Sequence, residues 1–163
     1  MSSIIKVAAD LKISQRTLID FGEFYSKIFL WSNLRGYNFS ETNYTDSDEF
    51  RGKQLEMTWE GSREYDDYVK FTMKVEIRIL GFDKVELEKN GSKVKTNKGD
   101  FTIKINSAIV LDYNDDYTTP FKKLLRKFYD KLISQKKIDD YKRALDDETQ
   151  ELVNEIKSAF SMF

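Results

Sequence analysis

The sequence predicts an α+β fold in which a curved antiparallel sheet, of about five to seven strands, is covered on one face by helices. Two observations predict the sheet: strict apolar–polar alternation from Val69 to Ile79 and a second alternating run from Phe101 to Leu111. A third predicts the cover, because apolar residues at helical spacing occur both before and after these runs. An N-terminal helix and a long C-terminal helical segment follow from that spacing.

The two alternating runs carry the strongest signal in the chain. Apolar side chains from Val69 to Ile79 alternate with Lys, Thr, Glu and Arg. A strand places successive side chains on opposite faces, so this period predicts one buried and one wet face. The run from Phe101 to Leu111 repeats the pattern, except that Ser107 interrupts the apolar face. We expect a bend or a small recess at Ser107.

Turn signals divide the region between the two runs into a short hairpin arm. Gly81-Phe82-Asp83 predicts a first turn, and Asn97-Lys98-Gly99 predicts a last one. Between them stands Asn90-Gly91, the pair that favours a type I′ turn because both central residues need positive φ. The prediction is a meander of antiparallel strands.

The N-terminal part predicts a short strand, a helix and two more strands. Ser3–Ala9 contains Ile4, Ile5 and Val7, which predict the short strand, and Ser14 is a candidate helix N-cap. Gly36 suits the left-handed position after a helix ending at Arg35. The stripe of that helix is made by Leu18, Phe21, Tyr25, Ile28 and Phe29. Strands are predicted for Tyr37–Thr45 and for the alternation of Leu55, Met57 and Trp59.

The C-terminal part of the sequence predicts helices that pack against the apolar face of the sheet. Thr119 before Pro120 is a helix start signal, since proline at the first helical position loses no hydrogen bond. An apolar stripe follows at Phe121, Leu124, Leu125, Phe128 and Leu132. A second stripe is formed by Ile138, Tyr141, Leu145, Leu152, Ile156 and Phe160. The segment is either one long kinked helix or two helices joined near Ser134.

Length and composition predict one domain spanning residues 1–163, with 137–163 as an additional C-terminal helix or interaction extension. The chain has no cysteine and no histidine, and its net charge is −1. Disulfides and thiolate metal sites are therefore excluded, and the usual general base near neutral pH is missing. We expect no enzyme activity, no metal and no cofactor. Neither a signal peptide nor a membrane span is evident, which favours a cytoplasmic protein.

Charged clusters give two weak functional signals. Asp112, Asp115 and Asp116 are acidic enough for a cation site, but they lack the spacing of a calcium loop, and a solvated turn is the favoured interpretation. The segment from Pro120 to Arg143 is basic, which would suit nucleic acid or an anionic membrane surface. Its candidate basic surface is Lys122, Lys123, Arg126, Lys127 and Lys131. A solvated outer face of a core helix is favoured here.

The abundant aromatic residues favour core packing and strand pairing. The sharper hypothesis is an apolar pocket between the curved sheet and the long helix, with Tyr hydroxyls and Ser107 as its polar groups. Its candidate lining is Tyr25, Phe29, Trp59, Phe71, Met73, Ile105, Ser107, Leu125 and Phe128.

The order of elements resembles the helix-grip arrangement of the START-like (SRPBCC, polyketide-cyclase-like) superfamily. The resemblance rests on Ile4–Val7, Leu18–Arg35, the strands from Tyr37 to Tyr113 and the helix beginning at Pro120. It is one of topology, without a diagnostic motif, and the helical segment after Lys137 departs from it. It implies a hydrophobic ligand held between sheet and helix without catalysis, and it assigns no functional residue.

Three hypotheses follow. The first is a non-catalytic module that binds a hydrophobic small molecule or lipid between the sheet and the C-terminal helix. The alternative is a structural or assembly subunit of a larger intracellular or viral complex, contacting another copy or a protein partner through Ile138–Phe163. The third is weak nucleic-acid binding through the basic helix, which would weaken steeply with salt.

Overall fold

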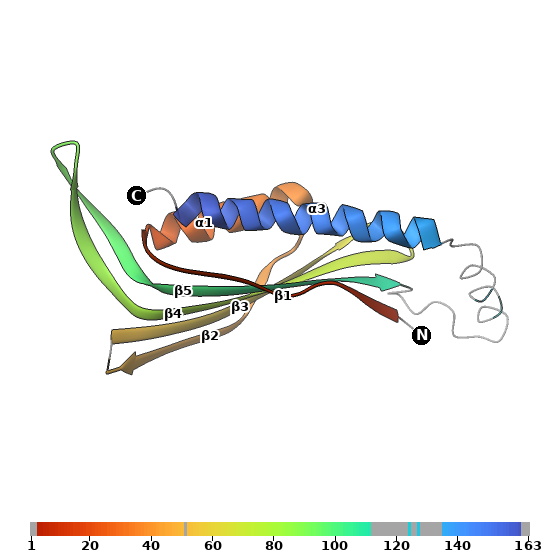
Figure 1. Ribbon diagram of the computed structural model, residues 1–163, viewed down its shortest axis with the longest axis horizontal. Helices are drawn as coiled ribbons and strands as arrows, with labels where there is room; N and C mark the ends of the chain where they lie inside the picture. The colour runs from red at the N-terminus through yellow and green to blue at the C-terminus, as the bar shows by residue number, and fades with distance from the viewer. Residues whose placement is uncertain (1–2, 51, 112–123, 125–126, 128–134, 161–163) are drawn as a thin grey trace.

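A computed structural model describes residues 3–50, 52–111, 124, 127 and 135–160. It confirms the predicted fold class: the protein is α+β, with one open antiparallel sheet and helices against it (Figure 1). The elements are β1 (Ser3–Ile19), α1 (Phe21–Arg35), β2 (Ser40–Glu49), β3 (Gly52–Glu64), β4 (Val69–Lys89), β5 (Ser92–Leu111) and α3 (Gln135–Phe160).

The sheet has five strands in the order β1-β5-β4-β3-β2, and every neighbouring pair is antiparallel. Strands β2 to β5 form a meander, as predicted. Strand β1 lies next to β5, on the side of β5 opposite to β4, and pairs with it from Ser3 opposite Leu111 to Ile19 opposite Asn97. The two ends of the sheet are therefore β1 and β2, and each leaves one edge without a neighbouring strand in the described sheet.

Strands β4 and β5 form one long ribbon that bends along its length and ends in a hairpin (Figure 1). Asn90 and Gly91 have φ of 53° and 78°, which confirms the predicted turn. The turn predicted at Asn97–Gly99 is wrong, because these residues pair with β1. Gly81 has φ of 66° beside a register shift between Leu80 and Asp83. It therefore marks a bulge that bends the ribbon instead of a reversal of the chain.

The boundary between β1 and α1 differs from the prediction. Ser14 is not a helix cap: it lies inside β1 and pairs with Thr102. The helix begins at Phe21, and the Asp20 carboxylate accepts the backbone N–H of Glu23 at 3.1 Å. Pairing along β5 extends the strand through residues whose spacing also suited a helix, since tertiary pairing outweighs local preference. The predicted end is confirmed, with Gly36 left-handed at φ 84°.

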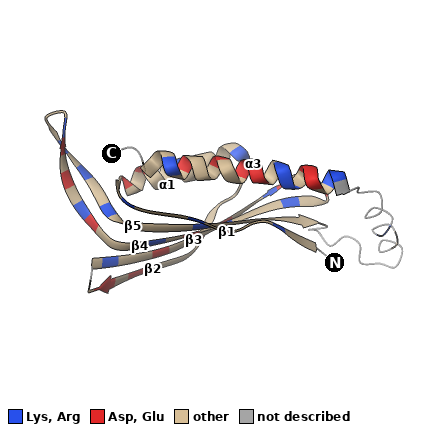
Figure 2. Cartoon of the chain, viewed as in Figure 1, with Lys and Arg blue, Asp and Glu red and all other residues tan. Residues whose placement is uncertain are grey.

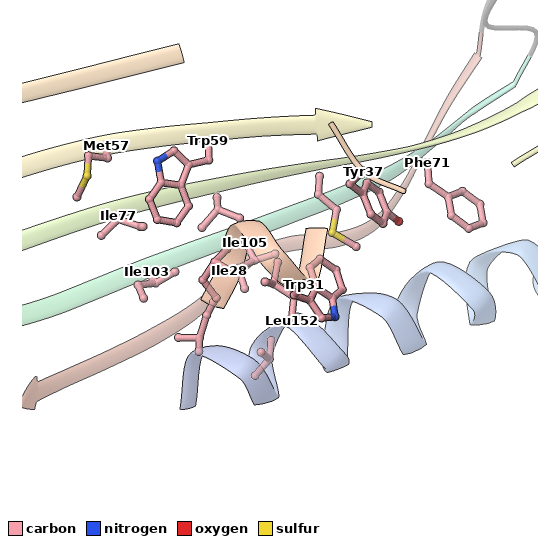
Figure 3. Close-up of a cluster of buried hydrophobic side chains, with 14 of the residues drawn as sticks. Ile28, Trp31, Tyr37, Met57, Trp59, Phe71, Ile77, Ile103, Ile105 and Leu152 are labelled. Carbon is pink, nitrogen blue, oxygen red and sulfur yellow. The ribbon is translucent and has the colours of Figure 1, made fainter. Parts of the chain in front are cut away.

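Both helices lie on the same face of the sheet (Figure 1). Side chains from this inner face and from the helices form a single core, part of which Figure 3 shows. The residues of α3 that enter it are Tyr141, Leu145, Leu152, Val153, Ile156, Ala159 and Phe160. The stripe predicted after Lys137 therefore packs on the sheet of its own chain.

The helix predicted from Pro120 lies mostly outside the described residues, including Phe121, Leu125, Phe128 and Leu132. Of its predicted apolar stripe, only Leu124 is described, and it is helical but 63% exposed. Its placement in the buried stripe is therefore wrong. In the described part of the chain, α3 is the C-terminal helix that covers the sheet, and it carries a long stripe of buried residues.

The two described helices, α1 and α3, do not cover the five strands completely. A helix is about 10 Å across and strands lie about 4.8 Å apart, so each helix covers roughly two strands. Strand β2 is exposed along nearly its whole length and is built of polar residues apart from Tyr44. Strand β1 is only partly covered, although its inner face is apolar.

The packing of α3 predicts a difference between two identical substitutions. Leu152 on α3 is fully buried, whereas Leu34 on α1 is 77% exposed. Leu152→Ala leaves a cavity and should lower the free energy of unfolding by about 2–5 kcal/mol. Leu34→Ala should change it by no more than about 0.5 kcal/mol. Urea denaturation followed by circular dichroism measures both; equal losses would contradict the packing of α3 on the sheet.

Candidate functional site

The interior position predicted for a ligand pocket is occupied by side chains of the protein. Trp59, Phe71, Met73, Ile105 and Ser107 are each no more than 2% exposed. The rings of Tyr25 and Phe29 lie against the Trp59 ring, each with centroids 5.2 Å apart. Leu125 and Phe128, the remaining predicted lining residues, lie outside the described part of the chain.

Contacts between the sheet and α3 fill the same layer. The ring of Phe160 stacks on Phe24 at 6.0 Å and lies 5.5 Å from Phe101. The hydroxyl groups of Ser107 and Thr149 hydrogen-bond at 3.1 Å and are both buried. Ser107 thus interrupts the apolar face of β5 because it has a polar partner on α3, and burial of a hydroxyl requires such a partner.

A hollow opens beside this filled layer, between the edge strand and the C-terminal helix. Its volume is about 510 Å³. We call it the β1–α3 groove, and its lining is Leu11, Lys12, Ile13, Ser14 and Gln15 from β1 with Gln150, Val153 and Lys157 from α3. The groove therefore lies between the sheet and the C-terminal helix, but at the sheet's edge and not at its centre.

The floor of the groove is an apolar row that the helix covers only in part. Leu11 pairs with Ile105 and Ile13 pairs with Ile103 in the β1–β5 register. Both β5 residues are 0% exposed, whereas their β1 partners are only half-buried. Ile5 continues this half-buried row toward the N-terminus. Coverage of the inner face thus drops within one strand, from complete at β5 to partial at β1.

A bulge shapes β1 next to this floor. The register shifts around Ala8, and Asp10 has φ of 48°, a left-handed conformation that a short polar side chain tolerates. The backbone N–H of Asp10 donates to Asn106 Oδ1 at 2.9 Å, and Asn106 Nδ2 donates to Asp10 Oδ1 at 3.3 Å. This pair of bonds fixes the bulge. A bulged edge strand also resists pairing with other chains.

Helix α3 is held by polar contacts on the side away from β1. Tyr37 and Arg63 both donate to the carboxylate of Glu148, and the Arg63 guanidinium lies over aromatic rings at 5.2–5.7 Å. One turn later, Arg35 of α1 donates to Glu151. Lys27 of α1 then donates to Ser158 at 2.9 Å. These contacts fasten the helix to α1 and β3.

The side of α3 that faces β1 borders the groove, whereas the opposite side is held by ion pairs and hydrogen bonds. Gln150, Val153 and Lys157 line the groove at the same three- and four-residue spacing as the fastened residues. Near the end of the helix, Thr17 of β1 donates to the carbonyl of Phe160 at 3.4 Å. The helix is thus anchored on one side and at its end, and its β1 side borders the groove.

The predicted basic surface is described only in part. Lys127 is exposed, while Lys122, Lys123, Arg126 and Lys131 lie outside the described residues, as does the acidic cluster of Asp112, Asp115 and Asp116. Along α3 the charges alternate in sign, as Figure 2 shows, and Arg143 lies 3.7 Å from the carboxylate of Asp140. Among the residues that the structure describes, no group of acidic side chains is arranged to hold a metal ion.

The sequence did not identify the polar residues of the groove, although it contained a signal for them. Gln150 and Lys157 each follow a residue of the buried stripe of α3 by one position, namely Thr149 and Ile156. These residues can be recognised as groove lining only when it is known that β1 continues past Ser14 and lies beside α3. That extension was not predicted.

No protein-family model matches the chain, and no curated protein matches its sequence. No helix in the described ranges is long and apolar enough to cross a bilayer.

The contacts of Glu148 predict its contribution to stability. The side chains of Glu148 and Arg63 are only 15% and 23% exposed, so Glu148→Gln leaves a half-buried guanidinium without its counter-charge. We expect the free energy of unfolding to fall by about 1–3 kcal/mol. Glu155→Gln is the matched control, since it alters a more exposed pair and should cost less than about 1 kcal/mol. Chemical denaturation compares the two; a larger loss for Glu155→Gln would refute this assignment.

The same cluster predicts a pH dependence. Burial, followed by the hydrogen bond to Glu148, raises the pKa of Tyr37 above its ordinary value of 10.0. Above that pH the unfolded chain releases the phenolic proton while the folded protein keeps it. Stability should therefore fall as pH rises past 10, by up to about 1.4 kcal/mol per pH unit from this group.

Tyr37→Phe removes the phenolic proton and supplies the control for this pH dependence. The variant should be less stable than the wild-type protein at pH 9, and the difference should shrink toward pH 11. Denaturation at the two pH values measures it, and a difference that stays constant would show that Tyr37 does not titrate in this way.

Proposed function

We propose that the protein is a non-catalytic binding module that takes an elongated apolar ligand, such as an alkyl chain, in the β1–α3 groove. The observation that carries this proposal is the half-covered apolar row of β1 beside fully buried neighbours on β5. Burial of apolar surface is favourable by roughly 25 cal/mol per Å², so an apolar chain lying on this row would be stabilised.

The groove has the dimensions and lining of a small-molecule site. Its volume of about 510 Å³ falls in the usual range for ligand pockets, about 300–1,000 Å³. Leu11, Ile13 and Val153 supply apolar contacts, and Gln15 and Gln150 add amide groups to the lining. The position between sheet and C-terminal helix is the one that the helix-grip resemblance implies, shifted to the edge because aromatic side chains occupy the centre.

The chemistry of the groove favours binding over catalysis. Its lining residues carry two ammonium groups, two amides and one hydroxyl, but no carboxylate. The chain has no histidine and no cysteine to act as base or nucleophile. We therefore assign no reaction to the groove.

The two other functional hypotheses have less support. The apolar stripe of α3 packs on its own sheet and is not available to hold another subunit. The exposed side of α3 alternates in charge (Figure 2), whereas a phosphate-binding surface concentrates positive charge.

The test uses a neutral probe, so that charge does not affect the result. Nile red fluorescence should rise on addition of the protein, and dodecan-1-ol should displace the dye. Ile13→Trp fills the floor of the groove and should weaken dodecanol binding at least tenfold. Ile4→Trp is the matched control, because it makes the same change on the same strand at a residue that is 69% exposed and outside the lining.

Thermal unfolding of both variants should first show that each is folded. Equal affinity of Ile13→Trp and Ile4→Trp for dodecanol would place the binding site elsewhere. No displacement by dodecanol from the wild-type protein would refute the proposal.

A further inference from the structure

The polarity of β1 changes along the side that faces α3. Its inward positions run from Ile5 through Leu11 and Ile13 to Gln15, which pairs with Phe101 on the inner face. Gln15 lines the groove, and α3 adds Lys157 toward the same end, where Thr17 contacts Phe160, whereas Gln150 lies two helical turns earlier. The row is therefore apolar toward the N-terminus of β1 and polar at its other end. A ligand that matches this gradient has an apolar tail and a polar head.

The charge of the groove sets it apart from the other surface hollows among the described residues. Each of four others contains carboxylates together with its lysines or arginines, as with Asp100 beside Arg16 and Glu60 beside Lys74. The β1–α3 groove is lined by Lys12 and Lys157 and by no acidic residue. Its lining is therefore positively charged, next to the apolar floor formed by Leu11 and Ile13.

These lysines also lack the partners that other cations of the protein have. Lys27, Arg35 and Arg63 each bind a carboxylate. No carboxylate of the described chain lies within 4.0 Å of Lys157 or Lys12. Lys157 extends from α3 on the same side as Gln150, and Lys12 lies at the rim, where it also borders the hollow on the open face of the sheet.

We propose that the ligand of the β1–α3 groove is a single-chain amphiphile with an anionic, oxygen-bearing head, whose head binds at Lys157. This inference rests on the proposed function, because the tail occupies the same apolar row. The Lys157 ammonium supplies the counter-charge, and the amide of Gln15 donates hydrogen bonds to the head-group oxygens. Lys12 adds positive charge at the rim.

The test compares probes that share a chain and differ in the head. Displacement of Nile red is measured with dodecanoate, dodecyl phosphate, dodecan-1-ol and dodecyltrimethylammonium, all below their micelle concentrations. We expect at least one anion to bind the wild-type protein tenfold or more tighter than the alcohol, and the cation to bind weakest. The ranking of carboxylate against phosphate then identifies which head the groove prefers.

Two variants separate a local contact from the overall charge. Lys157→Gln should remove most of the preference for the anion over dodecan-1-ol. Lys136→Gln makes the same charge change on the same helix at an exposed residue outside the lining, and it should keep the preference.

The outcomes distinguish this inference from the function on which it rests. If dodecan-1-ol binds in an Ile13-dependent way but the anions bind no tighter, the groove holds apolar chains and the head-group inference is wrong. A preference that survives Lys157→Gln, or that Lys136→Gln removes equally, also overturns it. If no probe binds, both proposals fail.

Discussion

Within the described chain, the helices α1 and α3 are together too narrow to cover all five strands of the sheet. Where α1 and α3 cover the sheet, side chains such as Trp59 and Ile105 are fully buried. The two outer strands receive less cover, and the sequence treats them differently. Strand β2 is polar, as expected for an exposed edge, whereas β1 keeps an apolar inner face. The apolar row of β1 is only half-covered by the rest of the chain. A ligand that covers it would therefore bury the most additional apolar surface there.

Helix α3 combines three functions in three parallel stripes. The central stripe, which includes Leu145 and Ile156, is buried against the sheet. A second stripe, beginning at Glu148, binds α1 and β3 through charged and phenolic groups. The third, from Gln150 to Lys157, borders the groove. Because the helix is fastened on its far side, its β1 side can border an open groove without loosening the fold.

Short-range sequence patterns predicted an element correctly where the pattern is compatible with only one type of secondary structure. Alternation from Val69 to Ile79 suits a strand and no helix, and Asn90-Gly91 suits one class of turn. Prediction was wrong where a segment satisfied two patterns. Ser14 resembled a helix cap and Asn97–Gly99 a turn, but pairing between β1 and β5 made both parts of strands. Such pairing joins residues far apart in the chain, so no local window contains it.

Four features could be predicted without coordinates: the class of fold, one apolar face of the sheet, the left-handed end of α1 at Gly36 and the lack of histidine and cysteine chemistry. These depend on residue type and on periods of a few residues. That aromatic rings fill the centre and that the hollow lies at the sheet's edge became known from the folded chain. A hollow forms where neighbouring elements leave surface uncovered. That depends on how β1, near residue 13, and α3, near residue 153, come to lie side by side.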